Sequence, residues 1–368
     1  MIQPAPNQSP ISVSVAALRP KAVRSTIYTH SNWAGSSPLS TEREGIVKQA
    51  GSDNRLSRVV AIINGKGGSG KTSLTANIAG QAAREAVGYN VLAVDLDLQG
   101  NLGLDLGYAG DADRDDEGRG IVEAVSQGVP LAVTRGVRTR LDVIPGGAHL
   151  EMLPAIEMVS VTGGPYELEG GSVQTAFAAR LAEIAAGYDL ILLDCAPGNP
   201  VLQQMALAAA RHVLIPTTTD AAGLDGLRMV GRRVKKAQQI NPELDYIGAI
   251  LFGHPTNATR IRRQAEEQLA AVADRVSLFT DVIRHSKATG DDCRLRGQLA
   301  HELARDAEQS ASERLSWLRT KQQDRGIRPA ALAEAAGSLA QDYWQVTYEL
   351  LSRINAREEA AEAVAGAS

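Results

Sequence analysis

Short apolar runs alternate with helical stretches through most of the chain between residues 59 and 288. The helical stretches include residues 71–87, 173–186 and 201–210. Short continuous apolar runs are typical of strands buried on both faces, and their alternation with helices is typical of α/β proteins. The pattern therefore predicts an α/β fold with a mostly parallel twisted sheet and helices on both faces. The predicted strands are Val59–Ile63, Val91–Val94, Leu141–Ile144, Leu190–Leu193, Val213–Ile215 and Ile247–Leu251.

The two ends of the chain lack this alternation. Residues 1–54 are rich in Ser, Pro, Ala and Asn and keep neither a helical nor a strand period, so we expect a disordered or loosely ordered arm there. Residues 55–356 are expected to form the ordered domain. Residues 357–368 are rich in Ala and Glu and are expected to be a flexible tail.

Two helices are predicted in the C-terminal third. A charged helix is expected at about residues 294–325 as an insertion, with Leu295, Leu299 and Leu303 on one stripe. The last helix has an apolar face that should dock on the core. That face is formed by Leu339, Tyr343, Val346, Leu350 and Ile354.

Net charge, cysteine spacing and the length of the apolar runs restrict the kind of protein that this chain can be. The chain has 38 Lys and Arg against 42 Asp and Glu, a formal net charge of -4, so any contact with nucleic acid must come from a local patch. Its two cysteines, Cys195 and Cys293, lack the paired spacing of a metal site. No apolar run is long enough to span a bilayer and the N-terminus does not resemble a signal peptide. We therefore expect a soluble protein of a reducing compartment.

A phosphate-binding loop is the strongest motif. Gly65–Thr72 matches G-x-x-x-x-G-K-[ST] in full, after a predicted strand and at the start of a predicted helix. The glycines let backbone N–H groups approach phosphates, and the helix N-terminus favours the negative charge. Lys71 is expected to reach the β- and γ-phosphates, and the Thr72 hydroxyl to bind Mg²⁺. A glycine-rich turn matching by chance would rarely have a strand before it and a helix after it.

Several segments together resemble the ParA/MinD family of deviant Walker-A ATPases, and ParA-type partition ATPases in particular. Lys66–Thr72 (KGGSGKT) resembles the family's K-G-G-x-G-K-[ST], and Asp95–Asn101 (DLDLQGN) its D-x-D-P-Q-G-N. Tyr188–Pro197 (YDLILLDCAP) resembles its Walker-B strand, and the segments 213–216 and 220–227 resemble the next strand and helix. The similarity covers about residues 59–288 and resumes in the final helix.

The resemblance implies an ATP-sandwich homodimer with ATP and Mg²⁺ as cofactors. In it, Lys66 reaches across to the partner's nucleotide, as an arginine finger does in other P-loop enzymes. The implied catalytic residues are Lys66, Lys71 and Asp97. The nucleotide-binding residues are Gly65, Lys66, Gly67, Gly68, Ser69, Gly70, Lys71, Thr72, Ser73 and Pro216.

Three aspartates complete the implied site. Asp97 would orient the attacking water, although a carboxylate in this place can also serve only as a turn cap. Asp194 would hold Mg²⁺ as the Walker-B aspartate with Thr72, and Asp95 would lie near the metal and its water shell. The sequence departs from the family pattern where Leu98 replaces Pro, and where Cys195-Ala196-Pro197-Gly198 replaces the commoner C/T-P-P-S type.

Basic residues cluster in the C-terminal half. Family resemblance implies that some of them bind DNA without sequence preference, through salt-sensitive phosphate contacts. The alternative is that they mark solvated helix faces. The candidates are Arg228, Arg232, Arg233, Arg260, Arg262, Arg263 and Arg284.

The function implied by the resemblance is plasmid or chromosome partition. ATP-dependent dimers would bind the nucleoid in the cytoplasm, and a ParB-like centromere-binding protein would stimulate hydrolysis. The N-terminal arm is too short and unpatterned for the helix-turn-helix domain of longer family members, so operator binding is not expected.

Three other functions would use a P-loop ATPase of this kind. A MinD-like membrane-associated ATPase would need a basic amphipathic C-terminal helix, whereas residues 356–362 (AREEAAE) are acidic. An iron–sulfur reductase or an amidotransferase-linked synthetase is disfavoured because two distant cysteines do not supply the usual ligands. A ParA-like ATPase that positions a protein cargo stays open, because its ATPase would look the same.

Overall fold

The computed structural model describes residues 56–218, 221–253, 263, 267, 276–319 and 336–365, without the side chains of 221–224 and 311–319. The expected N-terminal arm and two of the candidate DNA-binding residues, Arg260 and Arg262, lie outside the described residues.

Within the described residues, seven strands form one sheet in the order β3-β4-β2-β5-β1-β6-β7. All neighbouring strands are parallel except β3 and β4, so the predicted mostly parallel sheet is confirmed. The sequence did not predict β3, because this edge strand is half exposed and has no apolar run. The strands are β1 Val59–Ile62, β2 Val91–Leu96, β3 Thr134–Arg138, β4 Leu141–Ile144, β5 Leu190–Cys195, β6 His212–Thr217 and β7 Asp245–Leu251.

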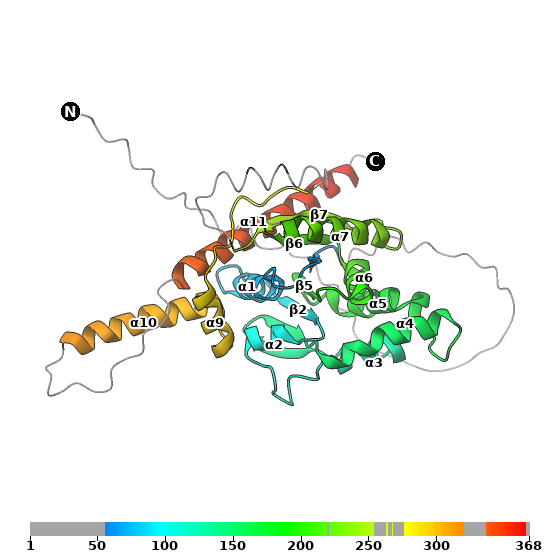
Figure 1. Ribbon diagram of the computed structural model, residues 1–368, viewed down its shortest axis with the longest axis horizontal. Helices are drawn as coiled ribbons and strands as arrows, with labels where there is room; N and C mark the ends of the chain where they lie inside the picture. The colour runs from blue at the N-terminus through cyan, green and yellow to red at the C-terminus, as the bar shows by residue number, and fades with distance from the viewer. Residues whose placement is uncertain are drawn as a thin grey trace, which may run out of the picture.

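Helices cover both faces of the sheet (Figure 1). Side chains alternate along β1, so that Val59 and Ala61 pack with α3 to α7 while Val60 and Ile62 pack with α1, α10 and α11. Among the described residues no helix is long and apolar enough to cross a membrane. The helices are α1 Lys71–Ala83, α2 Asn101–Leu106, α3 Arg119–Gln127, α4 Leu153–Val161, α5 Val173–Ala185, α6 Pro200–Ala209, α7 Ala221–Ala237, α9 Lys287–Arg296, α10 Ala300–Arg319 and α11 Ala336–Ala365, with short 3₁₀ turns at Ala148–Met152 and Glu169–Gly171.

The last helix docks as predicted but extends further. The predicted apolar face of α11, from Leu339 to Ile354, is buried in the core. The flexible tail expected from residue 357 is wrong for residues 357–365, which continue the helix. Polar contacts explain the difference, because Arg357 pairs with Asp245 at 3.2 Å and Glu358 accepts a 2.8 Å hydrogen bond from Arg58.

A single charged helix was expected at residues 294–325, of which residues 320–325 lie outside the described residues. The described part, 294–319, belongs to two helices. Gly297 caps α9 with φ of 59°, a left-handed conformation that ends the helix, and α10 begins three residues later. The predicted leucine stripe is therefore broken. Leu299 and Leu303 are buried, whereas the Leu295 side chain is 85% exposed.

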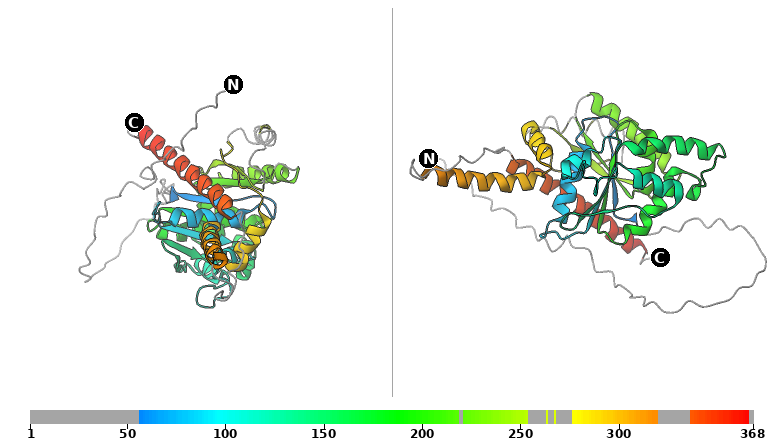
Figure 2. Two further views of the ribbon diagram at one scale, coloured as in Figure 1. Left: turned by 90° about the vertical axis from the view of Figure 1, so that its left-hand side faces the viewer. Right: turned by 90° about the horizontal axis from the view of Figure 1, so that it is seen from below.

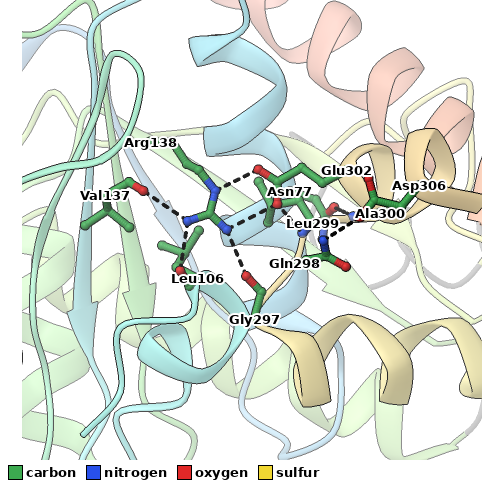
Figure 3. Close-up of polar contacts among 10 residues, drawn as sticks. All are labelled: Asn77, Leu106, Val137, Arg138, Gly297, Gln298, Leu299, Ala300, Glu302 and Asp306. Carbon is green, nitrogen blue, oxygen red and sulfur yellow. Dashed lines mark hydrogen bonds and ion pairs between the residues drawn. The ribbon is translucent and has the colours of Figure 1, made fainter. Parts of the chain in front are cut away.

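Arg138 of the edge strand β3 binds the junction of α9 and α10 through hydrogen bonds and an ion pair (Figure 3). Its guanidinium pairs with Glu302 at 2.7 Å and donates to the carbonyl oxygens of Gly297 at 2.8 Å and Leu106 at 3.0 Å. On the other side, Asn77 of α1 accepts a 2.9 Å hydrogen bond from the N–H of Ala300. From this anchored corner α10 projects away from the sheet (Figures 1 and 2).

We predict that Arg138→Gln loosens this corner. Loss of the guanidinium leaves three carbonyl oxygens without this donor and removes the ion pair of the mostly buried Glu302, which should lower the free energy of unfolding by roughly 1–3 kcal/mol. Urea unfolding measures the loss, and hydrogen exchange should locate it at residues 297–303. Arg135→Gln on the same strand is the control, because Arg135 is 75% exposed and its ion pair with Asp142 should contribute less than about 1 kcal/mol. Equal losses in the two variants would contradict the anchoring role.

Candidate nucleotide site

The glycine-rich loop joins β1 to α1 at the carboxyl ends of the parallel strands. Gly68 and Gly70 have φ of 73° and 79°, which residues with a side chain rarely adopt. Gly70 also caps α1, and any side chain there would overlap the ring of Phe252. The loop thus presents an exposed backbone at a helix N-terminus, which is the arrangement that binds phosphate.

Lys71 is buried at the base of the loop. Its Nζ donates a 3.1 Å hydrogen bond to the carbonyl oxygen of Lys66. Burial lowers the pKa of Lys71, and the negative charges of Asp194 and Asp97 oppose that effect. A bound phosphate would add negative charge beside this ammonium and favour its charged form further.

Asp194 and Asp95 lie side by side beneath the loop. The register of β2 and β5 pairs these two residues directly, and the register of β1 and β5 sets Ile62 beside Asp194. Both carboxyl groups are fully buried. Burial, then the charge of Asp194, raises the pKa of Asp95 well above its usual value.

The Asp194 carboxylate fits a divalent cation. Neither of its oxygens accepts a hydrogen bond from the described residues, although both are buried. Burial raises the pKa of Asp194 to about 7, while the Thr72 hydroxyl and the Lys71 ammonium lower it. A buried carboxylate with unsatisfied oxygens next to a hydroxyl is a donor set that suits Mg²⁺.

Asp97 occupies a turn next to these groups. Its N–H donates to Asp95 at 2.9 Å, and its carboxylate accepts from the N–H of Gln99 at 3.1 Å. The turn-capping alternative is therefore realised, but the side chain is also buried and its charge acts on Lys71. The structure brings Lys71, Asp95, Asp97 and Asp194 together at one site.

Comparisons with known proteins agree with this geometry. A family model described as an AAA domain matches residues 57–246. The chromosome-partitioning ATPase Soj of Thermus thermophilus is 35% identical over 215 residues, which are 58% of this chain and 76% of that protein. The chromosome partitioning protein ParA of Caulobacter vibrioides is 31% identical over 223 residues, which are 60% of this chain and 78% of that protein.

The chain belongs to the ParA/MinD family of P-loop ATPases. A solved McdA–ATP complex from Cyanothece shares the fold, with a TM-score of 0.57, 18% identity, and coverage of 80% of this chain and 96% of that one. The family membership makes the chain an ATPase.

Ser73 and Leu98, which both lie in segments that resemble the ParA/MinD pattern, make contacts that the sequence did not indicate. The Ser73 hydroxyl, predicted to bind nucleotide, donates to Asp105 at 3.0 Å. Asp105 accepts a second bond, at 2.7 Å, from Arg294 of α9. Leu98, at the family's proline position, packs against the apolar core. The only sequence signal for Asp105 was an acid between the apolar positions of α2.

Asn64 and Gly146 are further residues of the site that sequence reasoning missed. The Asn64 amide donates to the carbonyl oxygen of Pro216 at 2.6 Å and accepts from the N–H of Lys66 at 3.0 Å. Gly146 packs so closely on Asp95 that any side chain would overlap the carboxyl group. Their partners are distant in sequence, apart from Lys66, so local motifs gave no signal.

The candidate DNA-binding arginines of this ParA/MinD-family chain fall into two groups. Some are exposed to solvent, and others are buried or paired with acidic residues of the domain. On α7, Arg228 and Arg232 are exposed, whereas Arg233 has a buried guanidinium nitrogen for which the described residues offer no hydrogen-bond acceptor. Arg263 is 83% exposed beside Glu267. Arg284 is bound through two nitrogens to the buried Asp342, at 2.7 Å each, so its charge is used within the domain.

We predict that Lys71→Ala abolishes ATP binding. The variant removes the one buried ammonium at the base of the loop and leaves Asp194 and Asp97 without its charge. Isothermal titration with ATP measures the affinity, and a thermal melt shows whether the variant is folded. A folded Lys71→Ala variant with normal ATP affinity would refute the site.

Proposed function

We propose that this chain is an Mg²⁺-dependent partition ATPase that dimerises with ATP and binds duplex DNA without sequence preference. A ParB-like centromere-binding protein would stimulate hydrolysis, and the cargo would be a plasmid or a chromosome origin on the nucleoid. The observation that carries the proposal is the exposed Lys66 on a P-loop whose base holds Lys71, Asp97 and Asp194. Its relatives Soj and ParA, named for chromosome partitioning, support the choice of cargo.

The proposed nucleotide complex uses the residues of the site directly. Backbone N–H groups of Gly65–Thr72 would cradle the phosphates, with Lys71 beside them. Thr72 and Asp194 would hold Mg²⁺, with Asp95 behind them. When bound, Mg²⁺ neutralises charge that develops on the phosphates. Asp97 would hold the attacking water in line, because its buried carboxylate is fixed by the turn around it.

Lys66 is suited to a role between subunits. Its N–H is held by Asn64 and its carbonyl oxygen by Lys71, so its backbone is fixed at both ends. Its side chain nevertheless lies at the exposed tip of the loop. A lysine in that place adds positive charge to a nucleotide on a facing subunit, as a finger residue does.

The outer face of α7 is the proposed DNA contact. Exposed basic residues recur on it at helical spacing, with Asp225 as the acid paired to Arg228 at 3.1 Å. We call these residues the α7 basic face: Arg228, Arg232, Lys235 and Lys236. A membrane role is disfavoured by the described end of α11, where Glu359 and Glu362 are exposed.

We predict that binding to a random duplex requires ATP and weakens steeply with salt. Fluorescence anisotropy with ATP, with ADP and without nucleotide, at low and moderate salt, measures it. Binding in no nucleotide state would leave the ATPase intact and refute the DNA role, pointing to a protein or membrane scaffold.

The same assay tests the α7 basic face. Arg232→Glu combined with Lys236→Glu should weaken binding by at least about tenfold, because two phosphate contacts become repulsive. Arg135→Glu combined with Arg140→Glu, at the edge strand β3, changes the net charge by the same amount and is the matched control, which should bind as the wild type does. An equal loss in both would mean that net charge, rather than this face, sets the affinity.

We predict that Lys66→Ala binds ATP but does not form a hydrolysis-competent dimer. The nucleotide-binding backbone and Lys71 remain, whereas the charge offered to the facing subunit is lost. Light scattering reports the dimer and phosphate release the turnover. Normal dimerisation and turnover in the variant would show that Lys66 does not act across the interface.

A further inference from the structure

The inner face of α7 packs on the residues that begin the P-loop. A side chain at Gly65 would meet the sulfur of Met229 at 2.9 Å and the Cα of Gly226 at 3.3 Å. A side chain at Gly226 would overlap the amide oxygen of Asn64. Helix and loop are therefore in contact with no space between them.

The Asn64 amide lies at the centre of this contact. The residue is 1% exposed, and its oxygen accepts from the N–H of Lys66 at 3.0 Å while facing Gly226. Its nitrogen donates to the carbonyl oxygen of Pro216, on the neighbouring strand β6, at 2.6 Å. Because the amide is hydrogen-bonded to Lys66 and Pro216 and faces Gly226, a shift of the amide would disturb Lys66, Pro216 or α7.

A second contact joins α7 to α6. The guanidinium of Arg233 lies near Cys195, the residue after Asp194, and its pKa is lowered first by burial and then by the charge of Arg232. Gln204 of α6 donates to the backbone oxygen of Arg233 at 2.9 Å. The helix is thus held at both the P-loop and α6.

We propose that Asn64 is a positioning residue for Lys66, and that its contact with Gly226 couples Lys66 to the orientation of helix α7. The inference rests on the proposed function, because it connects the lysine offered across the dimer to the α7 basic face. A shift of the Lys66 backbone on engaging the facing nucleotide would move the Asn64 amide, and with it α7. Through the same contact, a change in the orientation of α7 would shift the backbone of Lys66.

Two glycines on α7 provide a matched test. Gly226→Ala presses a methyl group onto the Asn64 oxygen, whereas a methyl group at Gly231 would only approach the Tyr246 hydroxyl at 4.0 Å. Both substitutions raise helix propensity equally. We expect Gly226→Ala to keep ATP affinity within about threefold and to lower basal phosphate release and ATP-dependent DNA binding on the order of tenfold. Gly231→Ala should match the wild type in all three measurements.

A double-mutant cycle with Asn64→Ala separates the contact from general damage. Removing the amide removes the atom that the new methyl group meets, so Gly226→Ala should cause no further loss in the Asn64→Ala background. The proposal would be overturned if the losses caused by Asn64→Ala and Gly226→Ala were additive in the double variant. It would also be overturned if Gly226→Ala and Gly231→Ala behaved alike in all three measurements. Lost ATP affinity in Gly226→Ala would also overturn it, because the residue would then shape the phosphate loop as a whole.

The measurements distinguish this inference from the proposed function. If the wild type binds no DNA in any nucleotide state, the DNA role fails, and phosphate release at saturating ATP still tests whether Asn64 positions Lys66. If the wild type binds DNA with ATP and both alanine variants behave as it does, the partition function stands and the coupling is refuted.

Discussion

Two buried carboxyl groups, Asp95 and Asp194, are packed side by side under the P-loop, where the Lys71 ammonium offsets part of the charge of Asp194. The parallel register of β2 and β5 fixes them there, and burial raises the pKa of both. Burying unpaired carboxylates is unfavourable, so the surrounding structure must stabilise them. Asp95 receives backbone hydrogen bonds from Asp97 and Leu102, whereas Asp194 depends on Lys71 and Thr72. The domain thus keeps an excess of buried negative charge at the place where a divalent cation would neutralise it.

This site extends through α2 to the helices near the C-terminus. The loop that leaves Asp97 enters α2, whose Asp105 joins Ser73 of α1 to Arg294 of α9. The corner between α9 and α10 is bound in turn to β3 and α1 through Arg138 and Asn77. These helices lie beyond residues 57–246, where the family model ends. They are nevertheless part of the same packed unit, because two hydrogen bonds that meet at Asp105 link Arg294 of α9 to Ser73, the residue that follows Thr72.

The sequence predicted what depends on local pattern and missed what depends on distant partners. Apolar runs located the buried strands, and motif spacing located the phosphate loop and the aspartates. The half-exposed β3 has no such run, and Asn64, Asp105 and Gly146 acquire their roles from residues far along the chain. The sequence also did not predict the direction in which individual side chains point. The sequence predicted Arg233 and Arg284 to be surface cations. In the described structure Arg233 has a buried guanidinium nitrogen and Arg284 pairs with a buried aspartate.

Fewer of the candidate arginines are exposed than the sequence suggested. This is one reason to expect that DNA binding requires a dimer. The chain is net negative, and Asp225 offsets part of the α7 basic face. The dependence of affinity on salt and on the number of neutralised phosphates makes a single such face a weak binder. Joining two copies doubles the phosphates that are neutralised at once and makes the second contact intramolecular, which raises avidity by orders of magnitude without new residues. In the proposed dimer, ATP would therefore switch DNA binding on chiefly by bringing two weak faces together, and the Asn64 contact would set how those faces are oriented.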